Sequence, residues 1–134
     1  MVISNMRLAA TAVIRQKGDN NIVLGVSRKD DHTSFGLCGG KIDDGESFYD
    51  GMVREVKEET GINVLEASPI YFRQDGEFLV LTYLVTSWEG EIHTDEVGVV
   101  KWTTFDELKK GCFGEYNAEL ENHIINELQN QCGI

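Results

Sequence analysis

The sequence of 134 residues predicts an α/β fold, a layered sandwich with a mixed sheet. Strand-like segments alternate with helix-like ones, and the strands cluster around one helix in the middle of the chain. Further helical segments close the chain, which completes the pattern of a layered α/β protein. A chain of this length is most simply one domain, 1–134, and is long enough to bury a hydrophobic core.

Five segments have the composition of strands, because they are rich in apolar and β-branched residues and are bounded by turn residues. They are 7–16, 22–26, 62–72, 77–86 and 97–103. Asp75-Gly76 predicts a hairpin between the third and the fourth of these segments. Residues 30–45 are glycine-rich and polar, which predicts a loop with one short strand inside it.

Three segments favour helices. Residues 47–60 have helical periodicity, with Ser47 as the natural N-cap. Thr104 and Glu107 have the spacing of a capping box and should open a short helix that ends near Gly111. The last helix is expected over 117–129. Its apolar face is formed by Leu120, Ile124, Ile125 and Leu128.

The composition excludes several classes of protein. The net charge is −11, from 23 acidic and 12 basic residues, whereas proteins that track a nucleic-acid backbone need a basic surface. Three widely spaced cysteines without a Cys-x-x-Cys pair argue against a disulfide framework or a zinc site and favour a reducing compartment. The apolar run 8–14 is too short to span a bilayer and has no clear cleavage site. We therefore expect a cytoplasmic protein that binds neither nucleic acid nor membrane.

Three glutamates within 54–61, REVKEETG, are the most informative feature of the chain. On a helix that turns about 100 degrees per residue, Glu55, Glu58 and Glu59 share one edge, and Glu59 borders the apolar stripe. A solvated acidic face is the ordinary explanation of such a charge run. However, like charges at these spacings repel by about 0.2–0.5 kcal/mol per pair, and a carboxylate on the buried side is costly unless it is paired or bound to a metal.

A divalent cation would resolve this conflict. Arg54 can offset Glu58 four residues later, but it cannot serve all three acids. Clustered carboxylate oxygens, without Cys or a His pair, suit Mg²⁺ or Mn²⁺ and not zinc.

Three glycines and one more acid support such a site. With Ser47 as N-cap, Glu46 lies just outside the helix and could fold back toward the same edge. The stretch 39–40, Gly-Gly, could bring backbone carbonyls alongside it. Gly51 is unfavourable inside a helix by about 1 kcal/mol, which suggests that another group comes close to the backbone there.

The spacing of these residues resembles the Nudix box, GX5EX7REUXEEXGU, in which U is aliphatic. Gly40 is followed after five residues by Glu46, and after seven more by 54–62, REVKEETGI, so that every fixed position matches. The chain is therefore similar to the MutT/Nudix hydrolases, and the order of its elements resembles that family along most of its length. The resemblance implies a Nudix-type α/β/α sandwich with a central mixed sheet, in which the box forms loop, helix and loop. It also implies hydrolysis of a nucleoside diphosphate linked to another group X.

The resemblance assigns roles to individual residues. The metal contacts that it implies, with Mg²⁺ as the metal and Mn²⁺ as a substitute, are Gly40 through its carbonyl, Glu46, Glu55, Glu58 and Glu59. The catalytic residues that it implies are Glu55, Glu58 and Arg54. The arginine orients the catalytic glutamates in the family, often through an ion pair to the counterpart of Glu46.

The mechanism expected from this resemblance is attack of a water molecule on phosphorus. The cation would neutralise and orient the phosphate oxygens and lower the pKa of the water. The general base varies within the family: Glu55 is the first choice, Glu58 the second, and Glu96, on the loop before the last strand, an outside candidate. Two departures are visible, because Cys38 stands where many members have proline and 51–52, Gly-Met, replaces a common Ala-Ala pair. Neither departure touches the acids.

Substrate specificity in this fold lies outside the box. Aromatic side chains could stack on a nucleobase, although an ordinary core position is the simpler explanation for each of them. Asn117 could pair with a purine edge, although a helix N-cap is its simpler role. The candidate substrate contacts are Phe35, Glu96, Tyr116 and Asn117.

The small size and the lack of added domains resemble the family members that sanitise the nucleotide pool. Those enzymes cut ordinary or modified nucleoside triphosphates to a monophosphate and pyrophosphate, which is the predicted reaction. ADP-ribose, a dinucleoside polyphosphate, a nucleotide sugar or an RNA cap are alternative substrates. A sensor that binds a nucleotide without hydrolysis is a further alternative, although such proteins typically lose box glutamates and this chain keeps them. The expected partner is a small nucleotide, bound by a monomer or a homodimer.

Overall fold

The computed structural model describes residues 6–93 and 98–132, with side chains described as far as Ile124. The chain divides into two compact units. The first comprises Met1–Ile14 and Cys38–Glu96, and the second comprises Arg15–Leu37 and Val97–Ile134. The whole acidic cluster from Glu46 to Glu59 belongs to the first unit.

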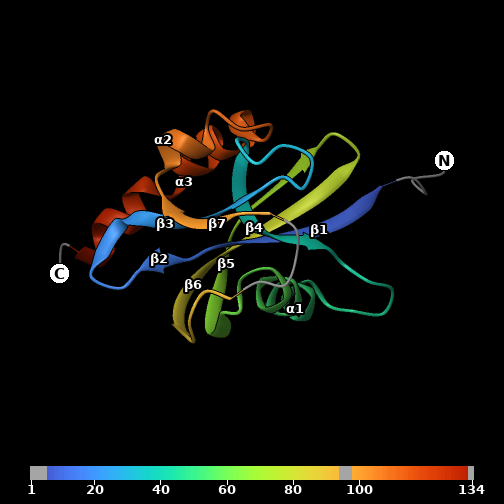
Figure 1. Cartoon of the computed structure of the whole chain (residues 1–134), viewed down its shortest axis with the longest axis horizontal. Helices are drawn as coiled ribbons and strands as arrows, with labels where there is room; N and C mark the ends of the chain where they lie inside the picture. Colours follow the sequence, from blue (N-terminus) through green and yellow to red (C-terminus); the bar gives the residue numbers. More distant parts are fainter. Residues whose placement is uncertain (1–5, 94–97, 133–134) are drawn as a thin grey trace. The chain divides into compact units, whose positions relative to one another are not determined.

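The first unit is a mixed sheet with one helix against it (Figure 1). Its elements are β1 (Arg7–Val13), β4 (Phe35–Lys41, in this unit from Cys38 onward), α1 (Phe48–Thr60), β5 (Asn63–Asp75) and β6 (Phe78–Glu89). The strands follow the order β4-β1-β6-β5. Strand β1 pairs antiparallel with β4 and parallel with β6, and β5 pairs antiparallel with β6. Helix α1 contacts β1 and β5, so the sheet supports the helix that carries the acids.

Helix α1 begins and ends where the sequence predicts. Ser47 Oγ accepts a hydrogen bond from the backbone N–H of Asp50 at 3.0 Å, which confirms the predicted N-cap. At the other end, Gly61 has a φ of 80° and donates its N–H to the carbonyl of Lys57. A Cβ at Gly61 would lie 2.7 Å from the backbone oxygen of His93, so only glycine fits there. The apolar stripe is fully buried at Met52 and Val56.

The N-cap should have a measurable effect on stability. Replacing Ser47 with alanine removes the acceptor for the Asp50 N–H, and we expect the free energy of unfolding to fall by about 1 kcal/mol. The measurement is urea denaturation followed by circular dichroism, with Ser68→Ala on exposed β5 as the matched control. Equal stability of the two variants would contradict the assigned cap.

Strands β5 and β6 form the predicted hairpin. Asp75 pairs directly with Phe78, and Gly76 takes a φ of 60° in the turn between them. Both strands are longer than the sequence predicts. The register shifts between Pro69 and Tyr71, so the strand accommodates its proline through an irregularity and continues beyond it.

The second unit contains antiparallel strands and the two remaining helices. They are β2 (Arg15–Gln16), β3 (Asp19–Ser27), the part of β4 up to Leu37, β7 (Val100–Thr103), α2 (Phe105–Leu108) and α3 (Gly114–Cys132). Strand β3 pairs antiparallel with β2, β4 and β7. The segment 7–16, predicted as one strand, is thus divided between β1 and β2. The short strand predicted within 30–45 is the seven-residue β4. Strand β7 begins three residues later than predicted, and Val97 lies outside the described residues.

The helices of the second unit confirm one predicted cap and correct another. Thr104 Oγ1 accepts a hydrogen bond from Glu107 N and caps α2, as predicted. Helix α3 begins at Gly114, so the prediction of Asn117 as an N-cap is wrong. Asn117 lies inside α3 and is 2% exposed, and its Nδ2 donates to the carbonyl of Leu108 at the end of α2. Leu120 and Ile124 are buried as predicted, whereas the side chains of Ile125 and Leu128 lie outside the described part of the chain.

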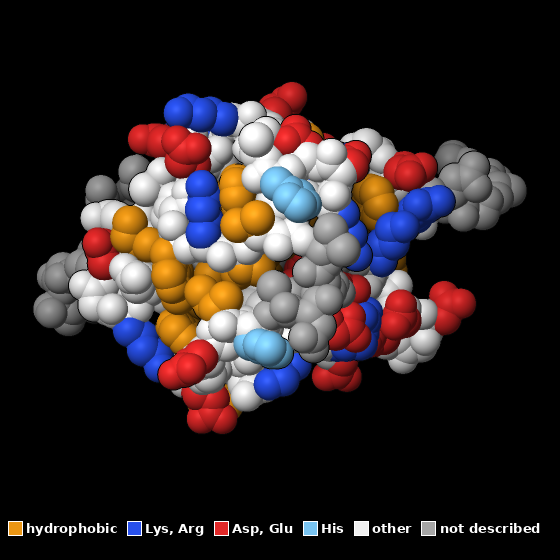
Figure 2. Space-filling model, in the orientation of Figure 1, with side chains coloured by type: hydrophobic (Ala, Val, Ile, Leu, Met, Phe, Trp, Pro, Cys, Tyr) orange, Lys and Arg blue, Asp and Glu red, His pale blue; other side chains and the backbone are white. Residues whose placement is uncertain are grey.

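Other features of the chain bear on the class of protein. Within the described residues, no helix is long and apolar enough to cross a bilayer. Cys38 is buried and Cys112 is exposed, and both are free thiols, while the side chain of Cys132 is outside the described part. On the face shown in Figure 2, the basic side chains lie among acidic ones. A single domain, cytoplasmic location, lack of nucleic-acid binding and oligomeric state stay predictions.

Candidate active site

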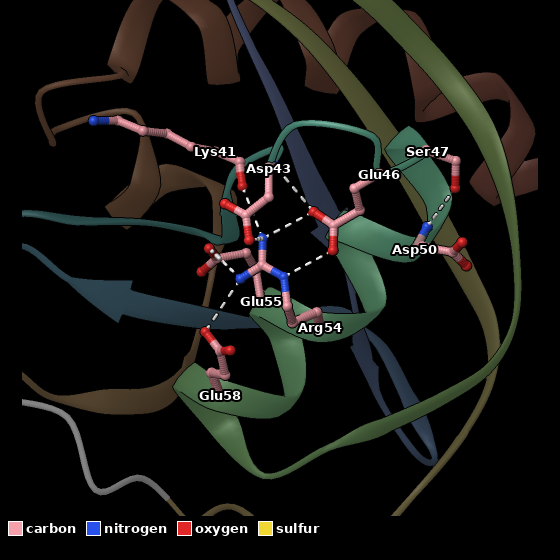
Figure 3. Close-up of polar contacts among 8 residues, drawn as sticks. All are labelled: Lys41, Asp43, Glu46, Ser47, Asp50, Arg54, Glu55 and Glu58. Atoms are coloured by element: carbon pink, nitrogen blue, oxygen red, sulfur yellow. Dashed lines mark hydrogen bonds and ion pairs between the residues drawn. The ribbon is translucent and has the colours of Figure 1, made fainter.

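The acidic cluster of the first unit is organised by one guanidinium, that of Arg54. Its Nη1 lies 3.0 Å from Glu55 Oε1 and 3.3 Å from Glu58 Oε2, and its Nε lies 2.8 Å from Glu46 Oε2 (Figure 3). The predicted ion pairs of Arg54 with Glu58 and Glu46 are therefore confirmed. Arg54 has two further contacts that the sequence did not predict. Its Nη2 donates to the Lys41 carbonyl at 3.1 Å and lies 3.4 Å from Asp43 Oδ2.

Glu46 folds back from the loop before α1 toward this cluster. Its two oxygens accept hydrogen bonds from Nε and Nη2 of Arg54, and Oε1 also accepts from the backbone N–H of Asp43. The Arg54 guanidinium, and after it the Asp43 N–H, lower the pKa of Glu46 from 4.5 to about 2. The same pairing with Glu46 raises the pKa of Arg54. Glu46 thus ties the loop to the helix as a carboxylate.

The contact between Glu46 and Arg54 should make the stability of the protein depend on pH in the acid range. Because the pKa of Glu46 is lower in the folded protein, its contribution is present above about pH 4.5 and is lost as the pH falls toward about 2. We expect the melting temperature of Glu46→Gln to lie below that of the wild type at pH 6, and the two to converge near pH 2. The measurement is thermal unfolding between pH 2 and 6, with Glu66→Gln on exposed β5 as control. A gap that stays constant over this range would contradict the assignment.

Two glycines leave the space that the carboxylates occupy. A Cβ at Gly40 would lie 2.6 Å from Glu55 Cδ and 2.7 Å from its Oε2, so the Glu55 carboxylate rests against the backbone of β4. A Cβ at Gly51 would overlap Ile42 Cδ1 and lie 2.9 Å from Glu46 Oε1. The prediction that a group approaches the helix at Gly51 is thus confirmed, and the approaching groups are Ile42 and Glu46.

Glu59 has a partner that sequence spacing did not reveal. Its Oε1 accepts a hydrogen bond of 2.7 Å from the backbone N–H of Gly39, twenty residues earlier in the chain. The carboxylate at the border of the apolar stripe is therefore compensated by β4. Next to it, burial, and after burial the Glu59 charge, raise the pKa of the Cys38 thiol, whose sulfur donates to the Ala12 carbonyl at 3.6 Å. Cys38 is consequently a neutral core residue.

The chemistry of the donor set fits a divalent cation of the Mg²⁺ type. Carboxylates of Glu46, Glu55 and Glu58 converge on one positive charge, and hard oxygen donors are the ligands that Mg²⁺ and Mn²⁺ prefer. In the described residues, however, no three His, Cys, Asp or Glu side chains are already grouped in the manner of a metal site. Arg54 instead supplies positive charge to Glu55 and Glu58, and Glu59 accepts a hydrogen bond from Gly39 N.

The candidate substrate contacts belong to the second unit, apart from Glu96, which lies outside the described residues. Phe35 is 7% exposed, and Lys101 Nζ lies 4.1 Å from its ring centroid. Tyr116 and Asn117 are also buried. These three side chains therefore contribute to packing of the second unit, which was the simpler explanation for the aromatic residues.

Comparisons with known proteins agree on one family. A model of the NUDIX domain matches residues 5–123. The 8-oxo-dGTP diphosphatase of Haemophilus influenzae is 30% identical over 130 residues, which cover 93% of this chain and 95% of the relative. That of Buchnera aphidicola is 33% identical over 95 residues, 68% of each chain. A solved structure of MutT, from work on Aliivibrio salmonicida and Vibrio cholerae, aligns with a TM-score of 0.73 at 27% identity and covers 91% of this chain and 98% of that one. The predicted α/β fold and family are confirmed: the chain belongs to the NUDIX domain family, the Nudix hydrolases, enzymes that act on phosphorus-containing anhydrides.

Proposed function

We propose that this chain is a Mg²⁺-dependent pyrophosphohydrolase that cleaves a nucleoside triphosphate to its monophosphate and pyrophosphate. The preferred substrate class is modified purine deoxynucleoside triphosphates, with 8-oxo-dGTP as the representative. The observation that carries the proposal is the convergence of Glu46, Glu55 and Glu58 on the single positive charge of Arg54. The names of the relatives from Haemophilus influenzae and Buchnera aphidicola support the choice of substrate.

The proposed reaction uses the carboxylates in distinct roles. A water oxygen bonds to phosphorus, the anhydride P–O bond breaks, pyrophosphate leaves, and Glu55 accepts the proton of the water. Arg54 Nη1 fixes Glu55 Oε1 at 3.0 Å, and Gly40 leaves room for the other oxygen, so the orientation of this base is set from both sides. Glu58, which is half-exposed on the same edge, is the second candidate for the base and a candidate metal contact.

The residues that would hold Mg²⁺ are Glu55, Glu58, Glu59 and the carbonyl of Gly40, whereas Glu46, whose two oxygens accept from Arg54 and Asp43 N, would keep the loop in place beside them. When bound there, the cation would supply charge neutralisation for the phosphate oxygens and acidify the attacking water. The acids alone would repel a triphosphate in a chain of net charge −11, so the proposal requires that hydrolysis depend on the cation.

A panel of nucleotides tests the proposal. The purified protein is incubated with 8-oxo-dGTP, dGTP, the other triphosphates, ADP-ribose, a dinucleoside polyphosphate, a nucleotide sugar and capped RNA, with and without Mg²⁺. Products are identified by mass spectrometry. We expect pyrophosphate and monophosphate from the triphosphates, with the highest kcat/KM for 8-oxo-dGTP. Turnover of only another substrate class would show that the proposed substrate is wrong. Tight nucleotide binding without turnover would show that the protein is a nucleotide sensor and not an enzyme.

Asn117 and the aromatic residues stay proposed contacts to the nucleobase, together with Glu96. Kinetics can separate this role from packing. If Asn117 contacts the base, Asn117→Ala should raise KM by about tenfold with kcat unchanged, because it removes binding common to the ground and transition states. If Asn117 serves only Leu108 O, the variant should lower the melting temperature and leave KM as it is. Measuring both on the same preparation decides between the two roles.

A further inference from the structure

The two sides of the Arg54 guanidinium have different partners (Figure 3). Nε and Nη2 face the loop before α1, where they contact both oxygens of Glu46 and the Lys41 carbonyl. Nη1 faces the helix edge, where it contacts Glu55 and Glu58. One residue therefore joins the loop to Glu55 and Glu58, two of the proposed metal contacts.

The loop side of Arg54 has the geometry of a strong contact. It is a bidentate pair with Glu46 at 2.8 and 3.0 Å, and Glu46 is itself held by Asp43 N at 3.0 Å. The Glu46 side chain is only 17% exposed. On the helix side, a single nitrogen is shared between two carboxylates, Glu55 at 3.0 Å and 19% exposed and Glu58 at 3.3 Å and 50% exposed, and neither contact is bidentate. The helix side is thus the weaker one and the easier to exchange with another cation.

A divalent cation at Glu55 and Glu58 would compete with Nη1 for the same oxygens, since two positive charges a few ångströms apart repel. We infer that Arg54 is an internal counter-ion, which holds the acids together in the absence of metal and releases Glu55 and Glu58, but not Glu46, when the cation binds. This inference rests on the proposed metal-dependent function. It assigns Arg54 a part in setting metal affinity, besides its part in orienting the acids.

A counter-ion and a purely orienting residue predict opposite effects on metal affinity. Removing the charge of a counter-ion strengthens metal binding, because the cation no longer displaces a competitor. Removing an orienting residue weakens metal binding, because the ligands become disordered. The sign of the change therefore identifies the role.

The experiment measures Mn²⁺ binding by the electron paramagnetic resonance signal of the free ion, on the full chain without nucleotide. The variants are Arg54→Gln, Arg54→Lys and Asp43→Asn, and circular dichroism checks that each one is folded. We expect Arg54→Gln to bind Mn²⁺ about threefold or more tightly than the wild type and to melt at a lower temperature in EDTA. Arg54→Lys should bind Mn²⁺ with nearly the wild-type affinity, because lysine keeps the positive charge. Asp43→Asn, which removes a negative charge on the loop side, should not tighten binding.

A second measurement uses the wild-type protein and is independent of mutant folding. In ¹H–¹⁵N spectra of the Arg54 guanidinium, addition of Mg²⁺ should change the Nη1 resonances while the Nε–H resonance, bonded to Glu46, stays in place. Unchanged or weaker Mn²⁺ binding by folded Arg54→Gln overturns the inference, as does an Mg²⁺ titration that moves Nε and leaves Nη1. In either of those cases the wild type still binds metal and the proposed function stands. Absence of metal binding to the wild type overturns both.

Discussion

Replacing Glu58 with glutamine should lower kcat by about a hundredfold or more while the fold is retained. We expect the activity to fall because the variant removes a negative charge from the proposed metal contacts. It also removes a candidate for the proton acceptor, a role typically worth about 10²–10⁴ in rate. The stability changes little because Glu58 is half-exposed and its contact with Arg54 Nη1 is 3.3 Å long. An exposed i,i+4 pair of this kind contributes about 0.5 kcal/mol or less.

The measurement is the initial rate of pyrophosphate release under saturating nucleotide and Mg²⁺, together with the melting temperature. Glu66→Gln is the matched control, since Glu66 is an exposed glutamate on β5 of the same unit and is not one of the proposed site residues. Its rate should equal that of the wild type. A rate for Glu58→Gln close to the wild-type value, in a folded protein, would remove Glu58 from the site.

Replacing either of two adjacent glycines with alanine should harm the protein in different ways, through activity at Gly40 and through stability at Gly39. At Gly40, the added Cβ would lie 2.6 Å from Glu55 Cδ, which is the end of a flexible side chain and can move. We expect Gly40→Ala to fold, with kcat lowered by about tenfold to a hundredfold because the proposed base is displaced by about an ångström. At Gly39, φ is 139°, and the Cβ would overlap the Ala10 carbonyl oxygen and lie 2.6 Å from Thr11 Cα. Backbone atoms of β1 cannot move away without breaking the pairing of β1 with β4.

We therefore expect Gly39→Ala to lose about 2–5 kcal/mol of stability or to fail to fold. The measurements are urea denaturation for stability and steady-state kinetics for activity, on both variants in parallel. The pair serves as its own control, since the residues are neighbours in β4 and receive the same methyl group. A Gly40→Ala variant with full activity would show that the Glu55 carboxylate does not need its place against β4. A Gly39→Ala variant of normal stability would contradict the packing of β4 on β1.

Helix α1 could be predicted almost to the residue because several local signals agree. Ser47 supplies the cap, the apolar stripe supplies the buried face, and Gly61 supplies the left-handed stop. The start of α3 could not be predicted as well, since Phe113, the residue before Gly114, carries no capping side chain. Asn117 is a good capping residue in isolation, but its amide is used inside the helix to satisfy Leu108 O, a tertiary contact that sequence spacing does not encode.

The acidic cluster likewise combines contacts that the sequence predicts with contacts that depend on tertiary packing. The contact between Arg54 and Glu58 follows from helical spacing alone, and that between Arg54 and Glu46 from the resemblance to the Nudix box. The contact of Glu59 with Gly39 N joins α1 to β4 and depends on tertiary packing. The approach of Glu55 to Gly40 is of the same kind. Sequence patterns therefore predicted which acids form the candidate site, whereas the positions of their oxygens required the fold.

The most direct test of the central claim is a crystal structure of the protein grown with Mn²⁺ and a non-hydrolysable nucleoside triphosphate analogue. We expect an anomalous scattering peak of manganese in contact with the Glu55 and Glu58 carboxylates and with phosphate oxygens, while Arg54 remains paired with Glu46. A nucleotide bound with its phosphates away from the acidic edge of α1, or manganese bound only elsewhere, would contradict it.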